Sequence, residues 1–230
     1  MADGLAAACV GTPVRAADRQ ASTTFDAYVP RLLAAWLTHE PGTRHRRVDG
    51  SIAFVDISGF TALTERLARR GKVGAELMSD TLDRTFDALL SAAREDGADL
   101  LKWGGDAVLL LFEGEDHPAR AARAAHRMRA TLRDLVRRDA LPVRLSMSIG
   151  IHTADFDLFL VGDPDSHLEL MVAGPAMSEL VGIEAFCAVG EIALSAATAA
   201  RLPARLTRPP SEPPGDPALA GVRVLRASPP

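Results

Sequence analysis

The sequence has 230 residues, 47% of them hydrophobic and 24% charged, which is the balance of a globular chain with one sizeable core. Its formal net charge of −4 argues against a protein that binds nucleic acid through bulk charge. Two cysteines are too few for a disulfide scaffold or a zinc site, and neither a signal peptide nor an apolar run of about 18 residues occurs, so we expect a soluble, cytoplasmic protein without a membrane span.

The N-terminal part of the chain is expected to lie outside the organised domain. Residues 1–22 are rich in alanine and lack periodicity, which indicates a loose arm. Residues 24–38 predict a short helix, and the polar stretch Pro41–Gly50 predicts a linker. We therefore divide the chain into an arm with a short helix (1–48), a main domain (49–201) and a proline-rich tail (202–230).

The main domain is expected to open with a strand and two helices. The apolar run Ile52–Ile57 leads into Ser58-Gly59, which predicts a buried central strand that ends in a turn. Helices are expected over residues 61–70, with Leu63 and Leu67 on one face, and over residues 73–95. The inner face of the second helix is expected to carry Val73, Leu77, Leu82, Phe86, Leu89 and Ala93.

A hairpin and a third helix are expected next. Gly104-Gly105 separates the apolar segments Leu100–Trp103 and Ala107–Phe112, and glycines accept the positive φ values of tight hairpin turns. Helix 117–138 is expected to bury one apolar face and to turn its many arginines to solvent. The buried face is expected to comprise Ala121, Ala124, Met128, Leu132 and Leu135.

The remaining elements are expected to complete a sheet. Residues 143–152 alternate between apolar and polar side chains, which predicts a strand with one buried face. The elements expected after it are strand 156–162, strand 167–173, helix 175–186, strand 189–194 and helical turn 196–201. Dense proline after Arg201 indicates a mobile tail with one late strand at Val222–Leu225.

The order strand–helix–helix–strand–strand–helix–strand predicts an α/β (α+β) fold of the ferredoxin-like or palm type. We expect an antiparallel-rich central sheet with its helices on one face. The other face of the sheet would then be open to a partner or a substrate.

Two aspartates are the strongest candidates for chemistry. Asp56 ends an apolar strand, where an unpaired carboxylate is costly, and Asp106 follows the hairpin turn on a strand that we expect to be its neighbour. Two carboxylates at adjacent strand ends form an oxygen-rich site for Mg²⁺ or Mn²⁺. Either aspartate alone is better explained as a turn residue, so the metal hypothesis depends on the pair.

The segment Ser58-Gly59-Phe60-Thr61 follows Asp56 directly. A glycine at a strand-to-helix turn exposes backbone N–H groups at the start of the helix, which suits phosphate. Many helices begin in this way, so the segment gains its meaning from the neighbouring carboxylate. Metals at the aspartates and amides in this turn could together hold one triphosphate.

These residues resemble the motifs of class III adenylyl and guanylyl cyclases. The similarity covers about residues 50–200, and residues 159–174 are most similar to the first catalytic half of the bicarbonate-regulated soluble adenylyl cyclases. The family's first metal motif, second metal motif, central strand and late strand are matched, in that order, by Phe54–Thr61, Leu101–Val108, Leu145–Thr153 and Gly190–Ser195.

The resemblance implies that the main domain converts ATP to cyclic AMP and pyrophosphate with two Mg²⁺ or Mn²⁺ ions. Asp56 and Asp106 would bind both ions, joined by the Ile57 carbonyl. Lys102 and Val172 would line either a base-recognition pocket or a regulatory pocket, and Lys102 can also be interpreted as a solvated strand residue. Phosphate contacts would come from Ile57, Ser58, Gly59, Phe60 and Thr61.

Several positions depart from the family pattern. The transition-state asparagine and arginine of the family would fall at Ser178 and Gly182. The adenine-contacting residue would fall at Met171, a phosphate-contacting basic residue at Ser148, and the bicarbonate-contacting arginine of the soluble enzymes at Val181. We therefore expect a second cyclase domain, in a heterodimer or downstream in a longer chain, to supply the missing groups.

Two alternatives stay open. A cyclase-like domain that binds nucleotide and only regulates would also lack the functions at Ser178 and Gly182. Diguanylate cyclases share Gly104-Gly105-Asp106, although their hairpin continues with Glu-Phe where this chain has Ala107-Val108. The histidines show no ligand spacing, and Trp103 beside the hairpin is expected to serve packing.

Overall fold

The computed structural model describes residues 29–138, 145–163 and 166–230. The expected arm 1–22 and the starts of the helix expected over 24–38 and of the strand expected over 143–152 lie outside the described residues. The helices are α2 (Arg31–His39), α3 (Phe60–Ala68), α4 (Gly71–Arg94), α5 (His117–Arg138), α6 (Pro175–Phe186) and α7 (Ala196–Ala200). The strands are β1 (His45–Ser58), β2 (Asp99–Gly104), β3 (Ala107–Glu113), β4 (Ser146–Asp163), β5 (His167–Ala173), β6 (Ile192–Leu194), β7 (Thr207–Arg208) and β8 (Arg223–Leu225). No helix in these described ranges is both long and apolar enough to cross a membrane.

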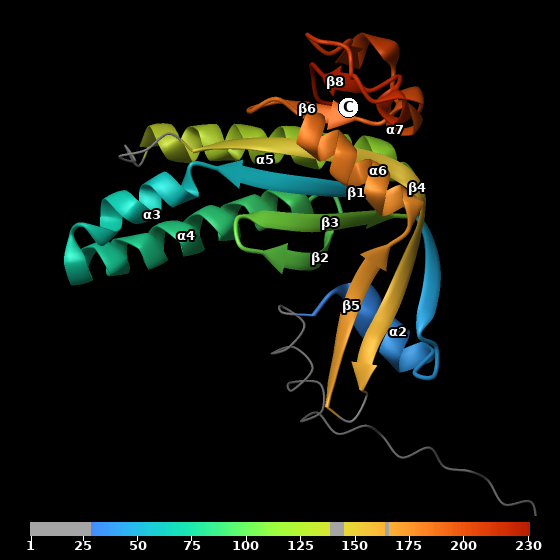
Figure 1. Cartoon of the computed structure of the whole chain (residues 1–230), viewed down its shortest axis with the longest axis horizontal. Coiled ribbons are helices and arrows are strands. Elements are labelled where there is room, and N and C mark those ends of the chain that lie inside the picture. Colours follow the sequence, from blue (N-terminus) through green and yellow to red (C-terminus); the bar gives the residue numbers. More distant parts are fainter. Residues whose placement is uncertain (1–28, 139–144, 164–165) are drawn as a thin grey trace, which may run out of the picture.

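One eight-stranded sheet organises the molecule, with the strand order β2-β3-β1-β4-β6-β8-β7 and with β5 paired to β4 beside this path (Figure 1). β1 pairs antiparallel with both β3 and β4, whereas β4 and β6 run parallel. The other pairings are antiparallel. The element order and the mostly antiparallel sheet confirm the predicted α+β class.

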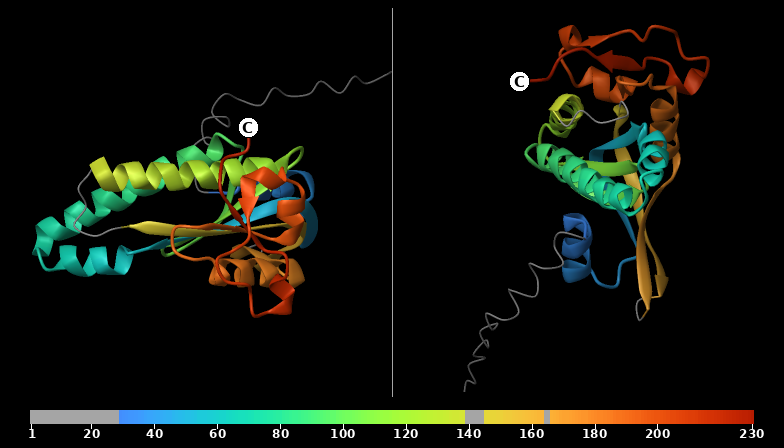
Figure 2. Two further views of the ribbon diagram at one scale, coloured as in Figure 1. Left: turned by 90° about the horizontal axis from the view of Figure 1, so that it is seen from above. Right: turned by 90° about the vertical axis from the view of Figure 1, so that its left-hand side faces the viewer.

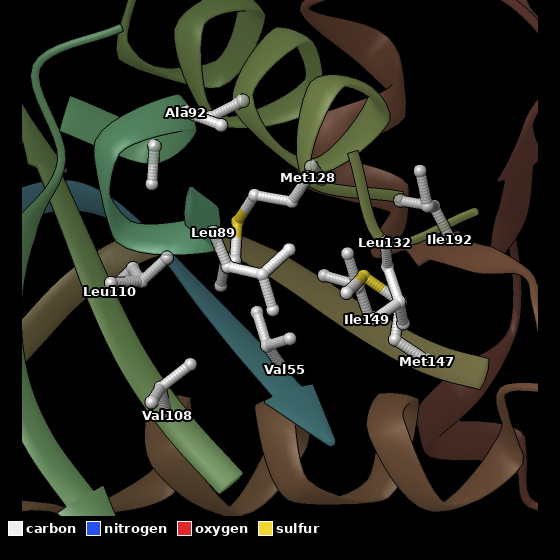
Figure 3. Packing of buried hydrophobic residues seen from close by; sticks show 14 of the residues in the cluster. Val55, Leu89, Ala92, Val108, Leu110, Met128, Leu132, Met147, Ile149 and Ile192 are labelled. Carbon is white, nitrogen blue, oxygen red and sulfur yellow. The ribbon is translucent and has the colours of Figure 1, made fainter. Parts of the chain in front are cut away.

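The main core lies between the sheet and helices α3, α4 and α5. Because side chains alternate along a strand, β1 turns Ala53, Val55 and Ile57 to this side. Figure 3 shows Val55 close to Leu89 of α4 and Met128 of α5. These contacts fix the end of β1 against the longest helices of the domain.

A helix also covers the opposite face of the sheet, so the expectation of helices on one face is wrong. α6 packs on β4 and β1 from that side, as the view from above in Figure 2 shows. Leu180 of α6 belongs to a second apolar cluster with Ile52 of β1. Strand β4 is therefore buried on both sides, and its polar residues Ser148 and His152 are only 6% and 4% exposed. The alternation in the sequence could not reveal a second buried face that contains polar side chains.

Strands β1 and β4 are longer than the sequence suggested. The strands expected over 143–152 and 156–162 are one strand, β4, whose second half pairs with β5. β1 begins at His45, inside the expected linker, because this polar stretch pairs with β4 as far as Phe159. In Figure 1, β4 and β5 extend together away from α3, α4 and α5.

The burial of the helices follows their distance from the sheet. Figure 1 shows the N-terminal half of α4 projecting beyond the sheet next to α3. Val73 and Leu77, which we expected on the inner face, are therefore 61% and 39% exposed, whereas Leu89 and Ala93 are buried as expected. In α5 the expected buried face is confirmed for Ala121, Ala124, Met128 and Leu132.

Residues 202–230, expected to be a mobile tail, extend the sheet. The expected late strand is present as β8, which pairs with β6 on one side and β7 on the other. Val222 and Val224 are buried, and Leu225 belongs to the main core. The dense prolines keep the strands of this segment short without keeping it from packing.

Candidate active site

The two candidate metal-binding aspartates lie close together, one on β1 and the other in the turn before the neighbouring strand β3. Asp56 is the third residue from the end of β1, where it pairs with Ala107 of β3 and with Ser148 of β4. Asp106 directly precedes β3, and its carbonyl oxygen accepts a hydrogen bond of 3.2 Å from the N–H of Ile57. The structure therefore brings Asp56, Ile57 and Asp106 together at one edge of the domain.

The electrostatics of this edge favour a cation. Burial, followed by the neighbouring Asp106 carboxylate, raises the pKa of Asp56 above its usual range. Burial and Asp56 likewise raise the pKa of Glu184 on α6, a carboxylate that the sequence analysis did not single out. In both groups burial disfavours the ionised form and a neighbouring carboxylate adds to this effect, so a bound cation would stabilise the ionised forms.

The donor set fits a divalent ion held in part by its substrate. Within the ranges that the structure describes, no three acidic, histidine or cysteine side chains converge as a metal-ligand group. Mg²⁺ is usually bound by one or two carboxylates, with waters and substrate phosphates completing its octahedron. Asp56 and Asp106 match that requirement because they supply two hard oxygen ligands and leave other positions to a nucleotide.

The turn between β1 and α3 has a geometry suited to phosphate. Gly59 precedes the helix with φ 101°, a value that favours glycine, and α3 begins directly afterwards with Phe60 and Thr61. The first backbone N–H groups of a helix lack partners within the helix and carry its positive dipole end. Ser58, at the end of β1, donates its hydroxyl to the carbonyl of Ser146 at 3.4 Å. Predicted phosphate contacts and predicted metal ligands are thus contiguous.

Aromatic packing holds the hairpin that carries Asp106. The indole N–H of Trp103 donates to the Gly105 carbonyl at 2.9 Å, and the ring meets Phe86 edge-on at 4.1 Å between centroids. Gly105 has φ 68°, so one of the two hairpin glycines takes the expected positive value. Phe86 in turn stacks on Phe60 at the start of α3. Trp103 serves packing, as expected, and links the hairpin to the phosphate turn.

Known proteins with similar sequences are adenylate cyclases. Adenylate cyclase type 10 from Homo sapiens is 26% identical over 154 residues, which cover 64% of this chain and 9% of that protein. Adenylate cyclase type 10 from Rattus norvegicus is 41% identical over 69 residues, which cover 29% of this chain and 4% of that protein. The chain thus matches a small part of each relative. No family model matches the chain.

Solved structures with the same fold are cyclase catalytic domains. The adenylyl cyclase CyaB from P. aeruginosa has a TM-score of 0.65 at 21% identity, over 80% of this chain and 97% of that one. The guanylyl cyclase Cya2 has a TM-score of 0.62 at 22% identity, over 80% of this chain and 93% of that one. The chain has the class III nucleotide cyclase fold. The resemblance drawn from its motifs is thereby confirmed.

A second region of interest in this fold lies between β2 and β5. Lys102 of β2 forms an ion pair with Glu169 of β5, and this hydrogen bond lowers the pKa of Glu169. Lys102 and Val172 both line a cavity of about 110 Å³, together with Met171. The two residues predicted to share a pocket do share one. The sequence analysis missed Glu169, although its place in the polar phase of β5 was a signal.

Helix α6 carries small or apolar residues at the positions where the family resemblance places polar groups. Ser178 is exposed, and its hydroxyl donates to the Gly174 carbonyl at 3.4 Å within the first turn of α6. Gly182, one turn later, has no side chain, and Val181 beside it is 43% exposed. Neither an amide nor a guanidinium group is present at the two positions where the family resemblance places them.

We expected the arginines of α5 to be solvated, but several of them have partners or line a cavity. Arg123 and Arg127 form ion pairs with Asp96, at the turn after α4. Further along α5, three arginines line a cavity of about 790 Å³ together with Ser58 and Gly59. These three are Arg129, Arg133 and Arg137, and we call the cavity the arginine pocket. Their spacing of four residues was visible in the sequence, but the strand ends that form the opposite wall were not.

Proposed function

We propose that this cyclase domain supplies the metal-binding half of an active site that converts ATP to cyclic AMP and pyrophosphate. The observation that carries the proposal is the juxtaposition of Asp56 and Asp106 beside the first turn of α3. In the proposed reaction the ribose 3′-hydroxyl attacks the α-phosphate, and pyrophosphate leaves. Two bound Mg²⁺ or Mn²⁺ ions would supply charge for the attacking and leaving oxygens.

Each predicted residue has a defined task in this proposal. Asp56 and Asp106 would hold the two ions through their carboxylates, with the Ile57 carbonyl as a further oxygen ligand. The backbone N–H groups from Ser58 to Thr61 would hold the phosphates at the start of α3. Lys102 would either contact the base or line a regulatory pocket. To contact the base, it would have to break its ion pair with Glu169.

The missing half of the site would come from a second cyclase domain, in a heterodimer or in a longer chain. The partner would provide the asparagine, the arginine and the base-recognition group that Ser178, Gly182 and Met171 cannot provide. Large apolar side chains that a partner could cover are exposed at Val161 of β4 (49%), Met171 of β5 (42%) and Val181 of α6 (43%). The proposal takes residues 49–201 as the catalytic unit and the cytoplasm as its location.

A second candidate function is a cyclase-like domain that binds nucleotide and regulates a partner. The absence of amide and guanidinium groups at Ser178 and Gly182 favours it. The retained carboxylates speak against it, because a domain without metal chemistry gains nothing from placing the partly buried Asp56 next to the exposed Asp106, whose charge repels it. The diguanylate cyclase alternative has no support beyond Gly104-Gly105-Asp106.

A cyclase assay separates these functions. The purified chain is incubated with Mn²⁺ and either ATP or GTP, alone and with a cyclase domain that carries the asparagine and arginine. We expect little or no cyclic nucleotide from the chain alone and a rise of orders of magnitude with the partner, each tenfold step being about 1.4 kcal/mol of barrier. Robust turnover by the chain alone would contradict the proposal that a partner supplies half of the site. Tight Mn²⁺-ATP binding without turnover, whatever the partner, would favour the regulatory function.

A further inference from the structure

The arginine pocket has walls from four parts of the chain. The C-terminal half of α5 contributes Arg129 and Arg133, and the end of β1 contributes Ser58 and Gly59. The start of β4 and the turn before β6 close the remaining sides, with Leu145, Ser146, Met147, Val189, Gly190 and Glu191. The turn proposed to hold phosphate is therefore also a wall of this cavity.

The positive charge in this pocket is only partly neutralised by the described residues. The Arg129 guanidinium donates to the Gly190 carbonyl at 3.2 Å, a neutral acceptor. Arg133 is exposed and forms no ion pair within the described part of the chain. The carboxylate of Glu191 also lines the pocket, but it is ion-paired with Arg208. Arg137 has only a loose pair with Asp134, at 3.7 Å.

The cations of α5 repel one another. Burial, followed by the charge of Arg133, lowers the pKa of Arg129. Burial and the same two arginines lower the pKa of His126 on the neighbouring turn. An anion between Arg129 and Arg133 would relieve this repulsion, since guanidinium groups form paired hydrogen bonds with phosphate oxygens.

We propose that the arginine pocket is an oligophosphate-binding site in which Arg129 and Arg133 contact the anion. The oligophosphate is either the phosphate end of the bound nucleotide or the pyrophosphate product. Ser58 and Gly59 line the pocket and also belong to the proposed phosphate turn. The naming of nucleotide and pyrophosphate as the two sources rests on the proposed cyclase function.

Metal-free binding of inorganic pyrophosphate tests this site directly. Isothermal titration calorimetry is done on the full chain with a chelator present, so that Asp56 and Asp106 cannot bind the anion through a metal. We expect wild type to bind, Arg133→Gln to bind at least about tenfold more weakly, and Arg129→Gln/Arg133→Gln to lose binding, since charge-assisted pairs of this kind dominate phosphate recognition. Arg138→Gln removes the same charge from an exposed position of α5 outside the pocket and should change the dissociation constant by less than about twofold.

Defined outcomes would overturn the proposal. It is wrong if wild type does not bind pyrophosphate without metal, or if Arg133→Gln and Arg138→Gln weaken binding equally, which would indicate bulk charge. Thermal unfolding without ligand checks that the variants fold. Arg133→Gln is the decisive variant, because this side chain is exposed and its loss breaks no ion pair with a described residue.

Competition identifies the source of the oligophosphate. If Mn²⁺-ATP displaces pyrophosphate from wild type, the pocket receives the phosphate end of the nucleotide; if both bind together, it receives free pyrophosphate. Asp106→Ala should lose Mn²⁺-ATP binding and keep metal-free pyrophosphate binding. If the proposed cyclase function were wrong, the proposal that this pocket binds oligophosphate could therefore still be correct. Conversely, suppose that wild type is active with a partner domain and that Arg129→Gln/Arg133→Gln shows the same turnover and the same inhibition by pyrophosphate. The proposal for the arginine pocket would then be wrong, and the proposed cyclase function would be unaffected.

Discussion

The end of β1 and the β5–α6 region offer a nucleotide very different chemistry on one fold. At the end of β1, Asp56 and Asp106 share one edge with the first turn of α3, and their charges interact. Between β5 and α6, the corresponding family positions hold Met171, Ser178 and Gly182, which carry neither charge nor amide. The first region has the carboxylates and the helix start that we propose to bind metal and phosphate, and the second has the same backbone without the expected polar side chains.

This difference is one of side chains and not of architecture. α6 is complete, and it packs on β4 and β1 through Leu180. A Cβ atom at Gly182 would lie 3.4 Å from the nearest side-chain atom, Cδ2 of Leu219, which is ordinary contact. The backbone at Gly182 therefore accepts a Cβ atom, and the comparison can be tested by removing groups from one region and adding them to the other.

The largest effect is expected from Asp106→Ala at the end of β1. Loss of a direct carboxylate ligand should weaken Mn²⁺-ATP binding at least about a hundredfold, because even outer partners of metal ligands are worth 10–100-fold in affinity. The fold should persist, since Asp106 is exposed and its backbone carbonyl still accepts from Ile57. Calorimetry with Mn²⁺-ATP measures the loss. Asp87→Ala on α4, which removes an exposed carboxylate elsewhere, should bind like wild type.

The next effect concerns the second region, where Ser178→Asn with Gly182→Arg should give a homodimer measurable activity. One donor to developing charge is worth about 10²–10³ in rate, so we expect at least a tenfold gain over wild type in a Mn²⁺-ATP assay. Ser178 is exposed, and a Cβ atom at Gly182 would lie 3.4 Å from Cδ2 of Leu219. Ser178→Asn with Ala185→Arg adds the same charge at another exposed position of α6 and should gain nothing. Equal gains in activity in the two double variants would show that the position of the added arginine on α6 does not matter.

A smaller effect is expected from Gly59→Ala, which tests the backbone of the first region. Gly59 has φ 101°, where a Cβ atom costs about 1–2 kcal/mol. We expect that loss of unfolding free energy and a matching loss of Mn²⁺-ATP affinity, because the first turn of α3 would shift. Gly104→Ala, with nothing within 4 Å of the added Cβ, should stay within about 0.5 kcal/mol of wild type. Denaturant unfolding and calorimetry report the two quantities.

Local sequence signals predicted the first region better than the second. The apolar run that contains Asp56 and the glycine hairpin before Asp106 placed the two aspartates close together at neighbouring strands, because strand periodicity and turn chemistry act over a few residues. The ion pair between Lys102 and Glu169 joins residues far apart in the chain, and no local pattern encodes that contact.

The errors in the fold have the same origin. Ser148 and His152 seemed to mark a solvent-facing side of β4, but α6, which follows later in the chain, covers them. Arg129 and Arg133 belonged to a row of arginines interpreted as solvated, and only tertiary structure places them opposite Ser58 and Gly59. Periodicity reports which side chains are apolar and does not report which later element covers the polar ones.

The smallest effect is expected from acid pH, which should lower the stability of the β5–α6 region more than that of the end of β1. His152 lies beneath α6 with its Nδ1 unpaired, 3.5 Å from the nearest carboxylate oxygen of Glu179. Burial lowers the pKa of His152 below its ordinary value of 6.5, although Glu179 partly opposes this shift. The unfolded chain therefore takes up the proton first. Stability that is present above pH 6.5 is lost as the pH falls toward the folded pKa.

Urea unfolding at pH 7 and pH 5 measures this loss, and His152→Asn should reduce it. The buried His117, whose pKa burial also lowers, should leave part of the acid sensitivity in that variant. His39→Asn, on the exposed end of α2, should retain the full dependence of wild type. Since His152 packs between β4 and α6, its protonation should loosen the second region while Asp56 and Asp106 keep their places on β1 and β3. Amide protection factors that fall from pH 7 to pH 5 in α6 and not in β3 would support this order, and equal falls in both would contradict it.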